Sequence, residues 1–188
     1  DGEREITALQ AAGLCDRHLG IGADGLIRAV RSENLPEGRD LLAEDSEALW
    51  FMDYRNADGS VSEMCGNGVR VFVAFLIDQG LASLEPGEVL PIGTRAGVKR
   101  VERREAGFAV DMGPWQFIHA AQAEADAGDS LVTADGLDVP RPALSVSMGN
   151  PHTVVALAED AELERLRLFA APFVEPVPPH GTNVEFVV

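Results

Sequence analysis

The chain is short of cysteine, of positive charge and of long apolar runs. Its only cysteines are Cys15 and Cys65, with no Cys-x-x-Cys pair or Cys/His zinc spacing, which argues against a disulfide scaffold or a metal site. Lysine and arginine number 15 against 31 acidic residues, so the formal net charge is −16. Because nucleic acids and anionic membranes are bound by clustered basic side chains, neither is expected as a partner. The longest apolar run, Val71–Ile77, is far too short to span a bilayer.

Aromatic residues are also scarce, at 6% of the chain, although hydrophobic residues make up 46%. A buried core would therefore consist mainly of valine, leucine, isoleucine and alanine. Nineteen glycines and eleven prolines indicate many turns and short strands. The absence of a recognisable signal peptide favours a cytoplasmic location. The length suits one large domain or two small ones.

The order of the periodic segments predicts an α+β fold. An Ala-rich polar stretch at 119–130 is interpreted as a boundary, which divides the chain into domains at 1–118 and 119–188. Residues 35–47 are predicted as a polar connector. The last predicted helix, at 159–169, is amphipathic, with Leu163, Leu166 and Phe169 on one face. The other predicted helices are 4–18 and 66–79, and the strands are 25–30, 48–55, several pieces within 88–111, 143–149, 152–157 and 183–188.

The segment "MCGNGVRVFVAFLI" at 64–77 sets a cysteine before a Gly-Asn-Gly turn and an apolar helix. If the helix begins at Gly66, Cys65 is at or near its N-cap, where the helix dipole and unbonded N–H groups favour a thiolate. The same N–H groups can hold a carboxylate. The turn therefore suits proton removal from a carbon next to a carboxylate, and the alternative is that Cys65 is a small buried hydrophobic residue. With Arg70 as the polar exception, the helix residues predicted as core are Val69, Val71, Phe72, Val73, Phe75, Leu76 and Ile77.

Four asparagines adjoin glycine-containing turns next to apolar segments: Asn56, Asn67, Asn150 and Asn183. Taken singly, each of these turns suits ordinary loop structure. Taken together, their uncharged amide donors and acceptors suit a small zwitterion that carries both ammonium and carboxylate groups. The set predicts a site for an amino acid.

Four segments occur in a characteristic order: "LCDRHLGIGADGLI" at 14–27, "MDYRNADGSVSEMCGNGVRVF" at 52–72, "SMGNPHTVV" at 147–155 and "GTNVEF" at 181–186. Together they resemble the diaminopimelate epimerase family over almost the whole chain. The resemblance implies two similar domains, each a curled sheet around a central helix. It implies cofactor-independent, metal-free interconversion of LL- and meso-2,6-diaminopimelate, on the route to lysine and peptidoglycan. It also implies a homodimer in the full-length protein.

The resemblance assigns roles to particular residues. Cys65 falls on the family's first catalytic cysteine, and His152 falls on a histidine thought to tune the acidity of the thiols. Gly25 stands where many members carry a glutamine that touches substrate, so that contact is expected to be lost or replaced. The family's substrate-binding positions correspond here to Asn56, Gly66, Asn67, Asn150 and Asn183.

Inverting a stereocentre by proton transfer needs a base on one face of the carbon and an acid on the other. Cys15 is not expected to be the second group, because it lies at a helix C-terminal end, where the dipole disfavours a thiolate. It is expected to be a buried structural cysteine. The family's second catalytic cysteine and its opening segment are not recognisable here. The chain is therefore expected to be an inactive fragment with an incomplete second domain.

Three alternatives remain open. The first is an epimerase for proline or hydroxyproline, although those relatives typically carry histidine where Asn67 stands. The second is a non-catalytic module that binds an amino acid in the same asparagine-lined site. The third is a thiol hydrolase in which His152 partners Cys65.

Overall fold

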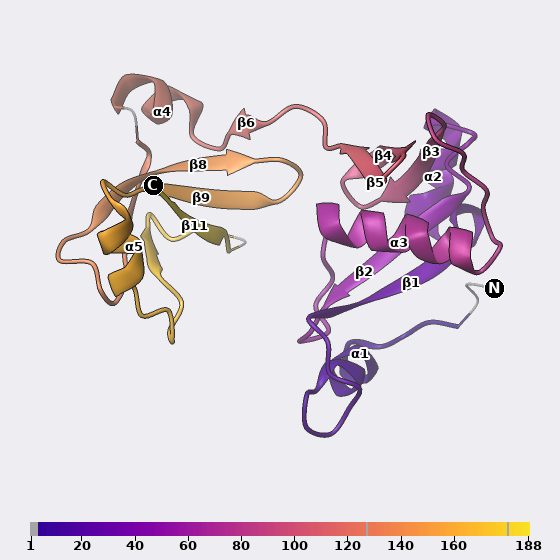
Figure 1. Cartoon of the computed structure of the whole chain (residues 1–188), viewed down its shortest axis with the longest axis horizontal. Helices are drawn as coiled ribbons and strands as arrows, with labels where there is room; N and C mark the ends of the chain where they lie inside the picture. The colour runs from indigo at the N-terminus through magenta and orange to yellow at the C-terminus, as the bar shows by residue number, and fades with distance from the viewer. Residues whose placement is uncertain (1–3, 127, 180) are drawn as a thin grey trace. The chain divides into compact units, whose positions relative to one another are not determined.

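The computed structural model describes residues 4–126, 128–179 and 181–188 (Figure 1). The chain divides into two compact units, one ending at Gly113 and the other running from Pro114 to Val188. Each unit contains its own curled sheet and its own hydrophobic core. The α+β class predicted from the sequence is confirmed.

The sheet of the first unit has five strands in the order β1-β2-β3-β4-β5. Neighbouring strands are antiparallel, except that β2 and β3 are parallel. The register places Gly25, at the start of β1, opposite Asn56, at the end of β2. The strands are β1 (Gly25–Arg31), β2 (Trp50–Asn56), β3 (Val89–Thr94), β4 (Gly97–Arg104) and β5 (Gly107–Asp111).

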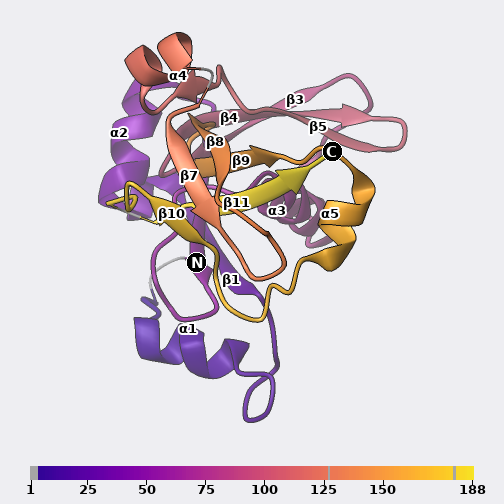
Figure 2. The same ribbon diagram turned by 90° about the vertical axis from the view of Figure 1, so that its left-hand side faces the viewer.

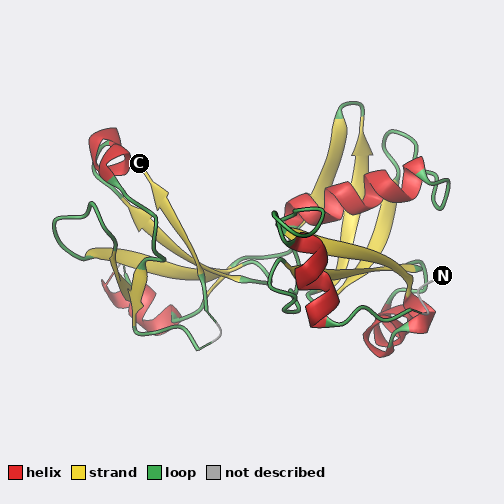
Figure 3. Cartoon of the chain, turned by 90° about the horizontal axis from the view of Figure 1, so that it is seen from below, coloured by secondary structure: helices red, strands yellow, loops and turns green. Residues whose placement is uncertain are grey.

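The helix α3 (Gly66–Asp78) lies across one face of this sheet (Figure 3). Its buried residues Val69, Phe72, Val73 and Leu76 pack with Met52 and Ile92 in the core of the unit. The prediction that Val71 and Phe75 also belong to the core was wrong, because these side chains are 63% and 47% exposed. They line a hollow of about 620 Å³ that residues of β1 and β2 also line, so the sheet leaves them partly open.

Two further helices, α1 and α2, belong to the first unit. Thr7 and Gln10 form a capping box at the start of α1 (Ala8–Cys15), as expected for a helix that begins with a threonine N-cap. The prediction of a polar connector at 35–47 was wrong, because α2 (Pro36–Glu44) occupies most of it after a short 3-10 turn, η1 (Ser32–Asn34). Proline suits the first turn of a helix. The rest of α2 has few apolar residues, so its sequence shows little apolar periodicity.

The sheet of the second unit follows the order β10-β7-β8-β9-β11, with β6 paired to β8 (Figure 2). The strands β9 and β11 are parallel, and the register places His152 opposite Asn183. Buried residues of the core include Val132, Val155 and Val174. The strands are β6 (Gln116–Phe117), β7 (Ser130–Thr133), β8 (Arg141–Ser147), β9 (Pro151–Ala156), β10 (Phe173–Glu175) and β11 (Asn183–Val187).

Two sequence predictions in the second unit need correction. The stretch interpreted as a linker at 119–130 holds a helix, α4 (Ala120–Asp126), and the start of β7; its residue 127 lies outside the described residues. The helix expected at 159–169 is shorter, because α5 (Asp160–Arg165) ends with Leu166 as its C-cap. Leu166 packs against the core, but Phe169 lies beyond the helix and is 95% exposed.

Within the described parts of the chain, no helix combines the length and apolar character needed to cross a bilayer.

Candidate active site

Cys65 is the N-cap residue of α3, with extended backbone and a half-buried side chain. Its carbonyl oxygen accepts the first helical hydrogen bond, from the Val69 N–H at 2.9 Å. Among the described residues, no side chain caps this helix. The predicted position of the thiol, beside the positive end of a 13-residue helix, is confirmed.

The two glycines that follow the thiol allow α3 to begin in close contact with its neighbours. A Cβ atom at Gly68 would lie 3.3 Å from Ile27 Cδ1 on β1 and 3.4 Å from the Cβ of Cys65. A Cβ atom at Gly66 would lie 3.3 Å from the sulfur of Met112. The space left by Gly68 is therefore taken up by packing against β1.

Asn56 ends β2 and opens a tight turn. Its N–H donates to the carbonyl of Ser60 at 2.9 Å, and its side-chain amide donates to the Ser60 hydroxyl at 3.0 Å. Gly59 has a φ of 84°, in the left-handed region that favours glycine. Hydrogen bonds from the Ser60 hydroxyl and N–H lower the pKa of the exposed Asp58 carboxyl. These bonds fix the turn that holds Asn56.

Asn67 and Arg70 face each other on the first turn of α3. The Arg70 guanidinium donates to the side-chain oxygen of Asn67. Both residues are exposed. The side-chain NH₂ of Asn67 remains available as a donor beside the helix N-terminus.

Tyr54 is a residue of this region that the sequence did not single out. A Cβ atom at Gly25 would lie 2.6 Å from Tyr54 Cε2 and 2.9 Å from the Tyr54 hydroxyl oxygen, so the ring covers the glycine. Burial raises the pKa of Tyr54, and negative charge on Cys65 or Asp24 raises it further. The place where a side chain at position 25 would extend is therefore filled by a phenol. Only the cross-strand register reveals this contact, so no local pattern could have found it.

The contact between Gly25 and Tyr54 gives a stability prediction. Gly25→Ala should lower the free energy of unfolding by about 1–3 kcal/mol, because the new methyl group meets the ring and also the Arg55 carbonyl oxygen, at 2.6 Å. Urea unfolding measures the change. The matched control is Gly13→Ala in α1, where nothing lies within 4 Å of the added atom and a gain of about 0.5–1 kcal/mol is expected. Equal changes in unfolding free energy for the two substitutions would contradict a steric clash between the new methyl group and Tyr54.

A buried ion pair cluster anchors the strand that carries Tyr54 and Asn56. The side chain of Asp53 is 4% exposed; it accepts from Arg28 Nε at 2.9 Å and from an Arg95 terminal nitrogen at 2.6 Å. Burial raises the pKa of Asp53, but hydrogen bonds and positive charge from Arg95 and Arg28 outweigh it and hold the pKa below the ordinary 3.8. The carboxylate therefore stays ionised and joins β2 to its neighbours.

In the second unit the structure brings together Asn150, His152 and Asn183. The His152 Nε2 atom lies 2.9 Å from the side-chain oxygen of Asn150, and Asn183 pairs with His152 across the parallel strands. The Asn183 side-chain amide donates to the carbonyl of Pro151 at 3.3 Å. A fourth residue, Glu185, places Oε1 2.6 Å from His152 Nδ1. Glu185 was not among the predicted site residues, although strand alternation sets it on the same face as Asn183.

The predicted site residues are divided between the units. Asn56, Cys65, Gly66 and Asn67 belong to the first unit, whereas Asn150, His152 and Asn183 belong to the second. Each unit therefore contributes one group of polar residues at the ends of its strands or helix. The assignment of these two groups to one substrate site is a prediction.

Cys15, the other cysteine, is the last residue of α1 and is 4% exposed. The prediction that it is a buried cysteine at a helix C-terminal end is confirmed.

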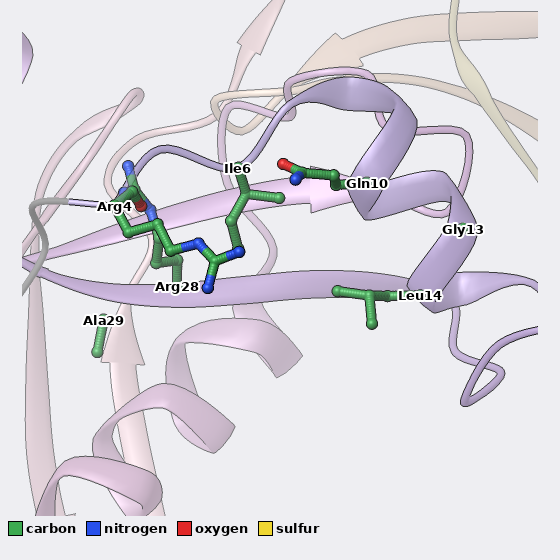
Figure 4. A pocket seen from close by; sticks show the side chains of 7 residues that line it. All are labelled: Arg4, Ile6, Gln10, Gly13, Leu14, Arg28 and Ala29. Atoms are coloured by element: carbon green, nitrogen blue, oxygen red, sulfur yellow. The ribbon is translucent and has the colours of Figure 1, made fainter.

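A separate cavity of about 650 Å³ lies between the N-terminal segment, α1 and β1 (Figure 4). None of the predicted site residues lines it. Its Arg28 side chain is already bonded to Asp53 and to the carbonyl of Arg4. In the described part of the chain, no three histidine, cysteine, aspartate or glutamate residues are grouped as a metal site.

The architecture and the site define a class: an α+β protein of two curled sheets, with a thiol at the start of a helix and asparagines at strand ends. A model of the family described as diaminopimelate epimerase matches residues 1–118. The chain belongs to the diaminopimelate epimerase family.

Named relatives extend the similarity over nearly the whole chain. A diaminopimelate epimerase of Thermobifida fusca is 43% identical over 191 residues, which cover 98% of this chain and 63% of the relative. One of Streptomyces coelicolor is 45% identical over 188 residues, covering 98% of this chain and 58% of the relative. One of Corynebacterium glutamicum is 40% identical over 193 residues, covering 100% and 63%. The chain thus spans about three fifths of the length of these relatives.

Among solved structures, a phenazine biosynthesis protein of the PhzF family from Bacillus anthracis shares 19% identity with this chain. The superposition covers 72% of this chain and 51% of that one, with a TM-score of 0.41.

Proposed function

We propose that a protein containing this chain is a cofactor-independent isomerase that interconverts LL- and meso-2,6-diaminopimelate. The position of Cys65 carries the proposal. A thiol at a helix start without a side-chain cap places a proton acceptor beside N–H groups that can hold a carboxylate. Removing the α-proton of an amino acid requires this pair, because the α-carbon is bonded to the carboxylate. Membership of the epimerase family supports the choice of substrate.

In this mechanism Cys65 removes the α-proton from one face of the substrate carbon. The resulting carbanion is stabilised through the carboxylate, which accepts from the first N–H groups of α3 and from the Asn67 amide. Asn56, Asn150 and Asn183 bind the polar groups of the substrate, and His152 tunes the acidity of the thiol chemistry. A second thiol returns a proton on the opposite face. Cys15 is not assigned that role, because its side chain is buried at the end of α1.

Proton NMR of LL-diaminopimelate in D₂O tests the proposal. The 188-residue chain is compared with a chimera in which it replaces the matching part of the Thermobifida fusca relative. The chimera is expected to exchange the α-proton for deuterium and to form the meso isomer. Proline and hydroxyproline serve as alternative substrates, and neither is expected to exchange.

The outcomes separate the candidate functions. Exchange of proline instead of diaminopimelate would replace the proposed substrate. Tight binding of diaminopimelate by the chimera without any exchange would identify an amino-acid-binding module. Epimerisation by the 188-residue chain itself would assign the second proton transfer to Cys15 or to another residue of this chain.

The family resemblance also supports proposals about the location, the pathway and the oligomeric state of the protein. We propose that it acts in the cytoplasm, on the route to lysine and peptidoglycan, as a homodimer. Light scattering on the chimera after gel filtration measures its mass and so tests the dimer.

A further inference from the structure

Glu185 faces His152 across the two parallel strands of the second unit. The register pairs Asn183 with His152, and the period of two along β11 puts Glu185 on the same face as Asn183. Glu185 Oε1 lies 2.6 Å from His152 Nδ1. Among the described residues, the histidine ring is the hydrogen-bond partner of this carboxylate, and its second oxygen, Oε2, is enclosed without one.

Both ring nitrogens of His152 have an oxygen-bearing neighbour. Nδ1 faces the Glu185 carboxylate, and Nε2 lies 2.9 Å from the side-chain oxygen of Asn150. An ionised carboxylate can only accept, so the bond to Glu185 requires a proton on Nδ1. A neutral ring then presents an unprotonated Nε2, which Asn150 can meet only with its amide NH₂ turned toward the ring. A charged ring donates from Nε2 to the amide oxygen.

The three side chains therefore form a hydrogen-bonded series in which Glu185 determines the orientation of Asn150 through His152. Glu185 fixes the proton on Nδ1 and the plane of the ring. The ring in turn restrains the amide of Asn150, one of the predicted substrate-binding residues. Without its acceptor at Nδ1, the ring could carry its proton on either nitrogen. The Asn150 amide, which faces Nε2, would then adopt either orientation.

We propose that Glu185 is a positioning residue, which holds His152 in the Nδ1-protonated form and thereby orients Asn150 for substrate. The role of Asn150 toward substrate rests on the proposed function, whereas the bond between Glu185 and His152 does not. The two parts are therefore tested separately.

The first test is nitrogen NMR of the 188-residue chain with ¹⁵N-labelled histidine and asparagine. Long-range proton–nitrogen spectra distinguish protonated from unprotonated ring nitrogens, and His152→Gln assigns the His152 signals. In the unchanged chain, Nδ1 of His152 is expected to be protonated. Glu185→Ala should abolish that preference and shift the side-chain NH₂ signals of Asn150. Glu185→Gln keeps an acceptor oxygen and should preserve the preference.

The matched control is Asp138→Asn, which removes an exposed carboxylate of the same unit that pairs with Arg165 at 4.0 Å. It should leave the His152 and Asn150 signals unchanged. An unprotonated Nδ1 in the unchanged chain would overturn the proposal. So would Glu185→Ala spectra in which both residues keep their original signals. Well-dispersed spectra of each variant establish that it is folded.

The second test measures kinetics in the chimera. Glu185→Ala should lower kcat/KM for diaminopimelate by about 10²-fold, the scale expected when a binding group is misplaced. Glu185→Gln should remain well above Glu185→Ala. If the unaltered chimera lacks epimerase activity, the proposed function fails while the NMR result still decides the positioning role. If the chimera is active and its Glu185→Ala variant has the same kcat/KM, orientation of Asn150 by Glu185 is excluded.

Discussion

Cys65→Ala in the chimera is expected to lower the rate of α-proton exchange from diaminopimelate by about 10²–10⁴-fold, the usual contribution of a positioned general base. The substitution removes the proton acceptor but leaves the backbone N–H groups at the start of α3 in place. Binding of diaminopimelate, measured by calorimetry, should therefore persist. The rate is measured by deuterium incorporation into both isomers.

Cys15→Ala is the matched control, because it removes the other thiol of the chain, which is buried at the C-terminal end of α1. It should retain exchange activity. An undiminished rate in Cys65→Ala would remove the thiol from the mechanism. Loss of activity in Cys15→Ala together with a folded spectrum would identify Cys15 as the second acid.

Asp53→Ala is expected to lower the free energy of unfolding of the first unit by about 3–5 kcal/mol, because it leaves two largely buried guanidinium groups without their shared anion. Urea unfolding followed by circular dichroism measures this loss. The control is Asp24→Ala, whose carboxylate pairs with Arg17 at an exposed site and whose removal should change stability by less than about 1 kcal/mol. Equal losses in the two variants would show that the buried cluster contributes no more than a surface pair.

The same cluster predicts a pH dependence with a definite sign. The pKa of Asp53 is lower in the folded chain than its ordinary value of 3.8, so its stabilising contribution is fully present above that value. The contribution is lost as the pH falls through the lowered pKa of the folded state. The difference in unfolding free energy between the unchanged chain and Asp53→Asn should therefore be constant near neutral pH and shrink below pH 3.8. A difference that grows on acidification would contradict this assignment.

Local sequence patterns predicted the elements that carry the candidate site. The start of α3 at Gly66 follows from a turn sequence placed directly before an apolar run, and both signals are contained in adjacent residues. The strands β1, β2, β9 and β11 follow from short apolar segments bounded by turns. Because these signals are local, no knowledge of the rest of the fold was needed.

The errors arose where tertiary contacts decide the outcome. Whether Val71 and Phe75 are covered depends on what packs against them, which the sequence of α3 does not specify. The helices α2 and α4 were missed because polar and alanine-rich segments carry little apolar periodicity. Tyr54 and Glu185 contact residues of neighbouring strands, so their partners follow from the pairing register and not from the local sequence.

The ring of Tyr54 lying over Gly25 means that these two positions cannot vary independently. A larger residue at position 25 requires a smaller one at position 54. The pair should therefore show strong energetic coupling in a double-mutant cycle. Paired exchanges at these two positions should pass through single variants that are less stable than either end point.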